Sequence, residues 1–299
     1  MYAGIDLGGT NIAVGITDAS GALLKKTSVP LGDAKKDPSE AADKMAEAIK
    51  TLGGLDGIDA VGIGSPGIVD PEAGKVIFAS NIAFSDYPLK DEMEKRLGKR
   101  CVLINDGNAA ALAESRLGAA KGYKNVVMMT LGTGVGGGII IGGEVYTGSL
   151  FGAGEVGHMV IAKGGRTCAC GRRGCFEQYA SATGLVKTTR EKAEKYPDSK
   201  LAGEEINAMT AFRLARAGDA AAAEAVDDFI SDLAQGTANI ITLFSPDAVV
   251  IGGGVSNEGD PLFIPLKEKV SGFIGGNTPI LKALLGSDAG IIGAARAAM

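Results

Sequence analysis

The spacing of apolar residues divides the start of the chain into short strands. Three are expected, at residues 2–6, 12–18 and 22–29, joined by "LGGTN" and by a turn at Ser20-Gly21. Each run is short, rich in apolar residues and bounded by turn-forming residues, which is typical of strands. The chain therefore begins with two consecutive strand–turn–strand units.

The next pattern predicts an amphipathic helix over residues 37–52. Asp37 is a suitable N-cap, Pro38 fits the first helical position, and Glu40 follows in the first turn. Apolar residues then recur with helical spacing until a Gly-Gly pair ends the pattern. These apolar residues are Ala42, Met45, Ala46, Ile49 and Leu52.

Strands and helices alternate through the rest of the chain, which indicates an α/β fold. The further expected elements are strands at 60–64 and 101–105, helices at 89–97, 108–117 and 219–244, a strand and glycine turn in "AVVIGGGVS" at 248–256, and a final helix that Asp288 caps. Pro246 separates the long helical region from the strand that follows it.

The segment "NVVMMTLGTGVGGGIIIGG", at 125–143, repeats the layout of the first strands. "MMTLGTGVGGGII" aligns with "GIDLGGTNIAVGI" from the N-terminus, since both read apolar strand, glycine turn, apolar strand. Such internal similarity predicts a structural duplication. We place a domain boundary near residues 118–124.

Composition narrows the class of protein. The 299 residues are 45% hydrophobic, enough for a sizeable core, and the 46 glycines favour many turns. The net charge of -5 and the lack of a long basic run do not favour a nucleic-acid partner. With neither a signal-peptide pattern nor an apolar run of about 18 residues, we expect a soluble, cytoplasmic protein.

The first glycine turn, "DLGGTN", fits a phosphate site. Gly8 and Gly9 lack β-carbons, so backbone N–H groups there can approach a polyphosphate closely. Thr10 and Asn11 can add side-chain hydrogen bonds, and Asp6 is placed to hold a divalent cation. The alternative is an ordinary hairpin turn, for which a glycine pair is equally suitable.

The second turn, "GTGVGG" at 132–137, matches the dinucleotide fingerprint only superficially. That fingerprint requires a helix after its last glycine, whereas an apolar strand is expected here. The pattern fits a triphosphate site better than a dinucleotide site. Two glycine turns would bind the triphosphate, and "GGGVS" at 252–256 would lie against the adenosine. The candidate nucleotide contacts in the second and third turns are Gly132, Thr133, Gly134, Gly136, Gly137, Gly253 and Gly254.

The only histidine, His158, precedes three of the four cysteines. Together with Cys168, Cys170 and Cys175 it would form a closed tetrahedral zinc site, which is typical of a structural role. "GRRG" supplies the turn that returns Cys175 to the cluster. Disulfides, or free thiols near a core histidine, are the alternatives, since the spacing is not a standard zinc-finger pattern.

Candidate catalytic residues lie in "IND", where the strand at 101–105 ends. Asp106 is placed to act as a general base toward a hydroxyl group, and Asn105 to orient a neighbouring hydroxyl. The alternative is an Asp-Gly turn, which the helical pattern that follows disfavours. Glu155 and Glu177 flank the cysteine cluster and can accept hydrogen bonds from hydroxyls.

These residues resemble the motifs of the ROK family (repressors, open reading frames, kinases), most closely those of its bacterial glucokinases. The similar motifs are "DLGGTN" at 6–11, "GSPGIVD" at 64–70, "INDGNAAALAE" at 104–114, "LGTGVGGG" at 131–138, "GEVGHM" at 154–159, "CACGRRGCFEQYAS" at 168–181 and "VVIGGGVS" at 249–256. The glycine turns are shared by the wider actin-like ATPase superfamily, so the other motifs are the more specific ones.

The resemblance implies a duplicated ribonuclease-H-like fold with a sugar cleft between two domains. Residues 1–120 and about 287–299 would form the smaller one, and 121–286 the larger one with the zinc site. It also implies a kinase that transfers a phosphoryl group from Mg²⁺–ATP to glucose, giving glucose 6-phosphate. Asn81, Glu155, His158 and Glu177 would contact the sugar.

Other functions stay open at this point. N-acetylmannosamine or another hexose is the alternative substrate. A sugar-sensing regulator of the same family would carry a DNA-binding segment before the first strand, which is expected to begin at Tyr2. A zinc-stabilised binding module would not need Asp106. We expect a hexose as ligand and a homodimer as the assembly, with no nucleic-acid or membrane partner.

Overall fold

The computed structural model describes residues 1–79 and 82–299 of the chain. Asn81, expected to contact the sugar, lies outside the described residues. Within the described ranges, no helix is both long and apolar enough to cross a membrane.

Two compact units share the chain, which crosses between them repeatedly. The chain first passes from the first unit to the second after Lys124, beside the expected boundary near 118–124. It returns to the first unit for the last time at Leu285. The first unit comprises Met1–Lys124, Gly138–Gly154 and Leu285–Met299, and the second comprises Asn125–Gly137 and Glu155–Leu284.

One segment differs from the expected division. We expected residues 138–154 in the larger domain of residues 121–286, but they belong to the first unit, which is consequently the larger one. The reason is that strand β10 (Val135–Ile141) runs through the division: it begins in the second unit and continues into the first. A boundary inside a regular strand leaves no linker composition for sequence analysis to detect.

The first unit contains a five-stranded mixed sheet. Its strands, in the order β3-β2-β1-β4-β8, are β1 (Tyr2–Leu7), β2 (Asn11–Thr17), β3 (Leu23–Pro30), β4 (Ala60–Ser65) and β8 (Arg100–Asn105). The hairpin strands β1, β2 and β3 pair antiparallel, whereas β4 pairs parallel with both β1 and β8. β4 is buried along its whole length, as expected for a central strand with helices on its faces.

Helices of the first unit follow the apolar pattern. They are α1 (Pro38–Thr51), α2 (Leu89–Leu97), α3 (Asp106–Arg116) and α9 (Ala289–Ala297). The predicted cap of α1 is confirmed, since Asp37 accepts hydrogen bonds from the N–H groups of Ser39 and Glu40 at 2.8 and 3.4 Å. Asp288 also precedes its helix as expected, but it makes no side-chain cap and binds Lys26 Nζ at 2.8 Å instead.

A small antiparallel sheet in the first unit was not predicted. Its strands are β5 (Ile68–Asp70), β6 (Lys75–Phe78) and β7 (Ser85–Tyr87), in that order. Each spans only 3 or 4 residues, and most of these side chains are not buried. Such strands lack the periodic burial that makes longer strands recognisable.

The second five-stranded sheet repeats the plan of the first. Its strands, in the order β11-β10-β9-β12-β13, are β9 (Val126–Leu131), β10, β11 (Glu144–Val145), β12 (Ala248–Gly252) and β13 (Ile280–Lys282). In both sheets the first strand is central, its hairpin neighbours lie on one side and parallel strands lie on the other. The predicted duplication and the α/β ribonuclease-H-like fold are therefore confirmed.

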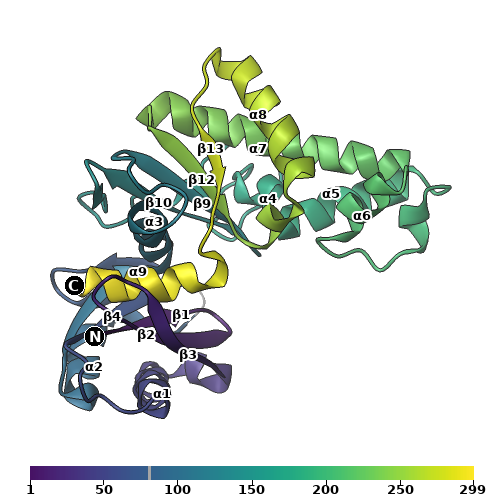
Figure 1. The fold of residues 1–299 in the computed structure, drawn as a ribbon. Coiled ribbons are helices and arrows are strands. Elements are labelled where there is room, and N and C mark those ends of the chain that lie inside the picture. Colours follow the sequence, from purple (N-terminus) through teal and green to yellow (C-terminus); the bar gives the residue numbers. More distant parts are fainter. Residues whose placement is uncertain (80–81) are drawn as a thin grey trace. The chain divides into compact units, whose positions relative to one another are not determined.

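Helices of the second unit pack mainly on one another. They are α4 (Glu177–Ala180), α5 (Ala182–Lys195), α6 (Thr210–Arg216), α7 (Ala220–Phe244) and α8 (Asp260–Ile274). The long α7 packs against α5, α6 and α8, as Figure 1 shows. Asp219 caps α7 by accepting from the N–H of Ala222 at 2.9 Å. The helix ends before Pro246, as predicted.

The C-terminal helix α9 belongs to the first unit, where it lies against β1, β4 and α3 (Figure 1). The approach is so close that only glycine fits beneath it. A β-carbon at Gly4 would collide with the carbonyl oxygen of Ile291, and one at Gly62 with that of Ala294. The helix thus covers one face of the first sheet with backbone-to-backbone contact.

Candidate active site and metal centre

The carboxyl ends of the parallel strands β1, β4 and β8 meet at one edge of the first sheet. Asp6 is in register with Gly64, and Ser65 with Asn105. Parallel strand ends are where α/β proteins gather functional groups, because helix N-termini and loops converge there. Asp6, Asn105 and Asp106 form what we call the strand-end site.

Asp106 is the first residue of α3, two residues before the predicted start of that helix. Its Oδ1 accepts hydrogen bonds from the N–H of Gly107 at 2.8 Å and from Asn105 Nδ2 at 3.1 Å. Asn105 in turn caps α3, because its Oδ1 accepts from the N–H of Asn108 at 3.0 Å, and its Nδ2 also donates to the carbonyl of Gly67 at 3.0 Å. Asn105 therefore orients the Asp106 carboxylate.

The first glycine turn connects β1 to β2 beside this site. Gly8 N–H donates to the carbonyl of Asn11 at 2.9 Å, and the side chains of Thr10 and Asn11 are exposed. Asp6 lies just before the turn, and burial raises its pKa to about 6. A largely buried carboxylate next to a phosphate-type turn is chemically suited to bind a divalent cation, which would compensate the charge that burial disfavours.

The second and third glycine turns lie together in the second unit. Gly132 N–H donates to the Gly134 carbonyl at 3.0 Å, closing a turn between β9 and β10 that we call the phosphate turn, residues Gly132–Gly134. Gly253 packs so tightly on the carbonyl of Leu131 that a side chain would not fit. The other candidate glycines of the second turn, Gly136 and Gly137, lie inside strand β10.

The strand after the second turn settles the nature of its glycine motif. β10 begins at Val135, directly after the phosphate turn, and no helix intervenes. The dinucleotide fingerprint requires a helix at this point, so its exclusion is confirmed.

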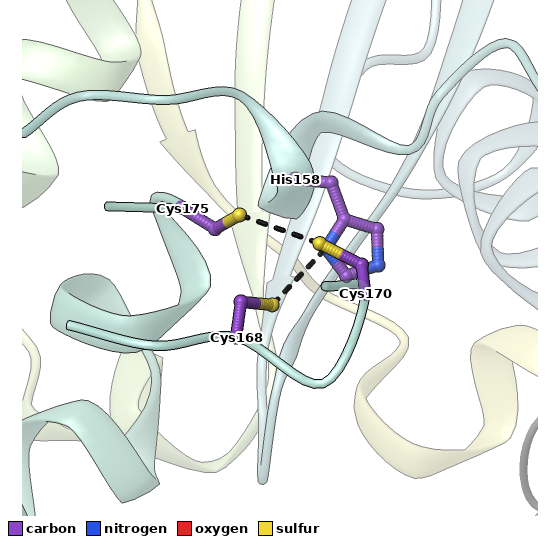
Figure 2. Close-up of side chains that lie close together, drawn as sticks. All are labelled: His158, Cys168, Cys170 and Cys175. Atoms are coloured by element: carbon purple, nitrogen blue, oxygen red, sulfur yellow. Dashed lines mark hydrogen bonds between the residues drawn. The ribbon is translucent and has the colours of Figure 1, made fainter. Parts of the chain in front are cut away.

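His158, Cys168, Cys170 and Cys175 come together as expected, and Figure 2 shows their side chains converging. Their potential ligand atoms all lie within 4.8 Å of one another. All four cysteines of the chain are free thiols, so the disulfide alternative is wrong. We call residues 158–175, which carry the cluster, the Cys/His knuckle.

The backbone of the knuckle contains two tight turns. Gly171 and Gly174 have φ values of 85° and 81°, which glycine adopts without strain. Isolated antiparallel bridges join Thr167 to Arg173 and Val160 to Cys175. The "GRRG" segment therefore turns the chain back as predicted.

The donor set fits zinc in charge and type. The backbone N–H of Arg172 and then its guanidinium lower the pKa of the Cys170 thiol to about 6, whereas burial and the neighbouring thiols raise that of Cys175 to about 12. Three thiols this close cannot all ionise unless a cation compensates them. Zn²⁺ would do so, with three thiolates and one imidazole completing a tetrahedral shell.

His158 turns its two ring nitrogens to different neighbours. Nδ1 lies 3.7 Å from Cys168 Sγ, facing the cluster, whereas Nε2 lies 4.0 Å from Glu155 Oε2. Glu155 is half exposed, with its side chain 50% accessible. In this orientation Nδ1 is the ring nitrogen that would bind a metal ion in the cluster, and Nε2 faces Glu155.

Glu177 begins α4, directly after the knuckle. Its Oε2 accepts a hydrogen bond from the N–H of Val135 at 3.1 Å, which ties it to the strand after the phosphate turn. The sequence predicted Glu177 as a polar contact but gave no sign of this partner, because 42 residues separate the two in the chain.

Arg166 is a residue that sequence analysis did not single out. Its guanidinium donates to the Gln178 carbonyl at 2.9 Å, to Thr188 Oγ1 at 3.0 Å and to Glu191 Oε2 at 2.7 Å. It also stacks on the Tyr179 ring at 4.8 Å. Arg166 thus fastens the knuckle to α4 and α5 independently of any metal.

Comparison with known proteins places this constellation in a family. The profile of the ROK family matches residues 2–299, so the chain belongs to the ROK family. It is similar to the glucokinase of Thermotoga maritima, with 41% identity over 98% of this chain and 95% of that protein. The glucokinase of Streptomyces coelicolor is 36% identical over 99% and 96% of the two chains.

A solved structure shows the same likeness in three dimensions. The ROK family glucokinase from Streptomyces griseus, in complex with glucose and AMPPNP, superposes with a TM-score of 0.85 at 36% identity. The match covers 99% of this chain and 98% of that one. The similarity is therefore global and is not confined to the glycine turns.

Proposed function

We propose that the protein is an ATP-dependent glucokinase, which phosphorylates glucose to glucose 6-phosphate. The observation that carries the proposal is the carboxylate of Asp106, fixed at a strand end by the N–H of Gly107 and by Asn105. Full-length similarity to glucokinases supports glucose as the substrate.

Asp106 acts as the general base. As the sugar's 6-hydroxyl oxygen bonds to the γ-phosphorus, the bond from that phosphorus to the β–γ bridging oxygen breaks and ADP leaves. The hydroxyl proton passes to the Asp106 carboxylate and then to solvent. Such a transfer depends on position and charge neutralisation more than on covalent catalysis.

The glycine turns are the candidate contacts of the nucleotide. The turn from Asp6 to Asn11 and the phosphate turn offer backbone N–H groups to the phosphates. Asp6 would hold Mg²⁺, directly or through water. When bound, the ion neutralises phosphate charge during transfer.

Sugar hydroxyls are read by groups around the knuckle. Glu155 and Glu177 accept hydrogen bonds from hydroxyls, and His158 Nε2 faces Glu155. Asn105 and Asn81 are further candidate sugar contacts. The metal cluster stays outside the chemistry, because four protein ligands leave no position for a water. Structural zinc would hold this reading surface rigid.

A panel of sugars with a coupled assay of ADP release tests the proposal. Glucose should be the best substrate, followed by its epimers, with N-acetylmannosamine and N-acetylglucosamine included as competitors. If no hexose releases ADP above background, the kinase proposal is wrong. Preference for an N-acetylated sugar would instead move the assignment to an amino-sugar kinase. Sedimentation of the purified protein tests the proposed homodimer.

A further inference from the structure

The segment that follows the knuckle is tied to the phosphate turn. Ala182 N–H donates to the carbonyl of Gly132 at 2.9 Å, and Glu177 Oε2 accepts from the N–H of Val135 at 3.1 Å. On the other side of the knuckle, Gly157 lies so close to the Val135 carbonyl that a β-carbon would collide with it. Both ends of the knuckle therefore contact the backbone around the phosphate turn.

The phosphate turn is shaped around the Glu177 carboxylate. A β-carbon at Gly134 would collide with Glu177 Oε2, so any larger residue would push the carboxylate away. Within residues 1–79 and 82–299, the N–H groups of Thr133 and Gly134 have no acceptor, whereas that of Val135 is held by Glu177. The two N–H groups without an acceptor therefore lie directly before Val135, whose own N–H is held by Glu177.

We propose that Glu177 is a positioning residue for the nucleotide as well as a sugar contact. By holding the N–H of Val135 it fixes the phosphate turn, so that Thr133 and Gly134 present their N–H groups to the phosphates without an ordering cost. This inference rests on the proposed kinase function, since it assigns the phosphates of ATP to that turn.

The same carboxylate can engage both substrates because its two oxygens have different partners. Oε2 accepts from the N–H of Val135, directly after the phosphate turn. Among the described residues, Oε1 has only a long contact of 3.5 Å with Gln178 Nε2. A sugar hydroxyl that donates to Oε1 would hold the carboxylate in the position that suits Val135. Glucose should therefore tighten nucleotide binding, and nucleotide should tighten glucose binding by the same factor.

Simple electrostatics predicts the opposite result for removal of Glu177. A negative charge beside a polyphosphate is repulsive, so its loss alone would tighten nucleotide binding. Loss of the hydrogen bond between Val135 and Glu177 would instead weaken nucleotide binding, because the nucleotide itself must then order the phosphate turn. The sign of the change therefore separates the two explanations.

The experiment measures the affinity of Mg²⁺–AMPPNP by calorimetry, without sugar, for four variants. Glu177→Ala removes the acceptor and Glu177→Asp withdraws it by one methylene, so both should weaken binding on the order of tenfold, the value of a charged hydrogen bond. Glu177→Gln keeps an oxygen at full reach and should stay within about twofold of wild type. Glu155→Gln, which changes only the sugar side, serves as the matched control and should bind nucleotide normally.

Zinc content and a cooperative thermal transition show that each variant retains its fold, and Glu177→Asp replaces Glu177→Ala if the latter fails to fold. Unchanged or tighter binding in both shortened variants would overturn the proposal, as would an equal loss in Glu177→Gln. If the wild-type protein itself neither binds Mg²⁺–AMPPNP nor phosphorylates glucose, the kinase function fails. A functional kinase whose Glu177 variants bind nucleotide normally would overturn the positioning role alone.

Discussion

Asp106 and Glu177 are both carboxylates that accept hydrogen bonds from backbone N–H groups, but the donors come from different places. The donor to Asp106 is Gly107, the next residue in the chain, at 2.8 Å. The donor to Glu177 is Val135, 42 residues away in sequence, at 3.1 Å. The first carboxylate is aimed by local helix geometry, and the second by the folding of a knuckle onto a distant turn.

This difference predicts how each carboxylate responds to perturbation. Regular strands and a capped helix carry Asp106, so changes in its chemistry should leave the fold intact. Isolated bridges and a cluster of thiols carry the knuckle, so changes in its structure should alter binding at a distance.

The largest effect is expected for Asp106→Asn. Removal of a general base typically lowers the turnover rate by about 10²- to 10⁴-fold. The thermal transition and the affinity for Mg²⁺–AMPPNP should stay close to wild type, because Asn can still accept the hydrogen bond from Gly107. Turnover near the wild-type rate would remove Asp106 from the mechanism.

A smaller but more distant effect is expected for Cys170→Ala. Loss of one ligand should release the zinc and weaken glucose binding by about 10- to 100-fold, although Cys170 touches no sugar in the proposal. Elemental analysis and the KM for glucose measure the two parts. Cys101→Ala is the matched control, since this buried cysteine lies outside the knuckle and should leave the zinc content unchanged. Metal-free protein with normal glucose affinity would show that the cluster does not support the sugar site.

The sequence could predict Asp106 and its local contacts, but only some of the residues and contacts of the knuckle and Glu177. Asn105, Asp106 and the cap at Asp37 each depend on neighbours within a few residues, and the pattern of apolar residues places the strands before them. The ligands of the knuckle were recognisable because cysteine and histidine are rare in this chain. The partners of Glu177 and Arg166 were not, since neither residue type nor spacing encodes contacts that form only after the chain has folded.

The strand-end site also contains Asp6, whose charged carboxylate should favour the proposed function but destabilise the fold. Burial raises the pKa of Asp6 from 3.8 to about 6. Its protonated form therefore favours the fold below about pH 4, and this contribution disappears as the pH rises through 6. Above that pH the buried charge is a cost, so Asp6→Asn should raise the free energy of unfolding on the order of 1–3 kcal/mol at pH 8 while lowering kinase activity.

Urea unfolding without Mg²⁺ or nucleotide measures this change. The gain should shrink as the pH falls from 8 to 4, because the wild-type carboxylate becomes protonated over that range. A variant that is less stable than wild type at pH 8 would contradict the desolvation argument.

The smallest effect is expected for Arg166→Lys. Lysine keeps the charge but cannot reproduce the fork that reaches Gln178, Thr188 and Glu191 at once. We expect a loss of about 1–2 kcal/mol in stability and faster release of zinc to a chelator, with little change in turnover at saturating glucose. Arg173→Lys, which alters an exposed arginine of the same loop, is the control. Equal rates of zinc release in the two variants would mean that the metal holds the knuckle without help from Arg166.

The placement of α9 has a consequence for the order in which the protein can fold during synthesis. The helix that covers β1 and β4 is made only after residues 155–284 of the second unit have been synthesised. Until then one face of the first sheet has no cover, although its strands were synthesised first. The N-terminal half must therefore wait for the C-terminal end of the chain, in contrast to the usual case in which domains complete themselves from the N-terminus. A ribosome that stalls before residue 289 would leave this sheet face open to other chains or to chaperones.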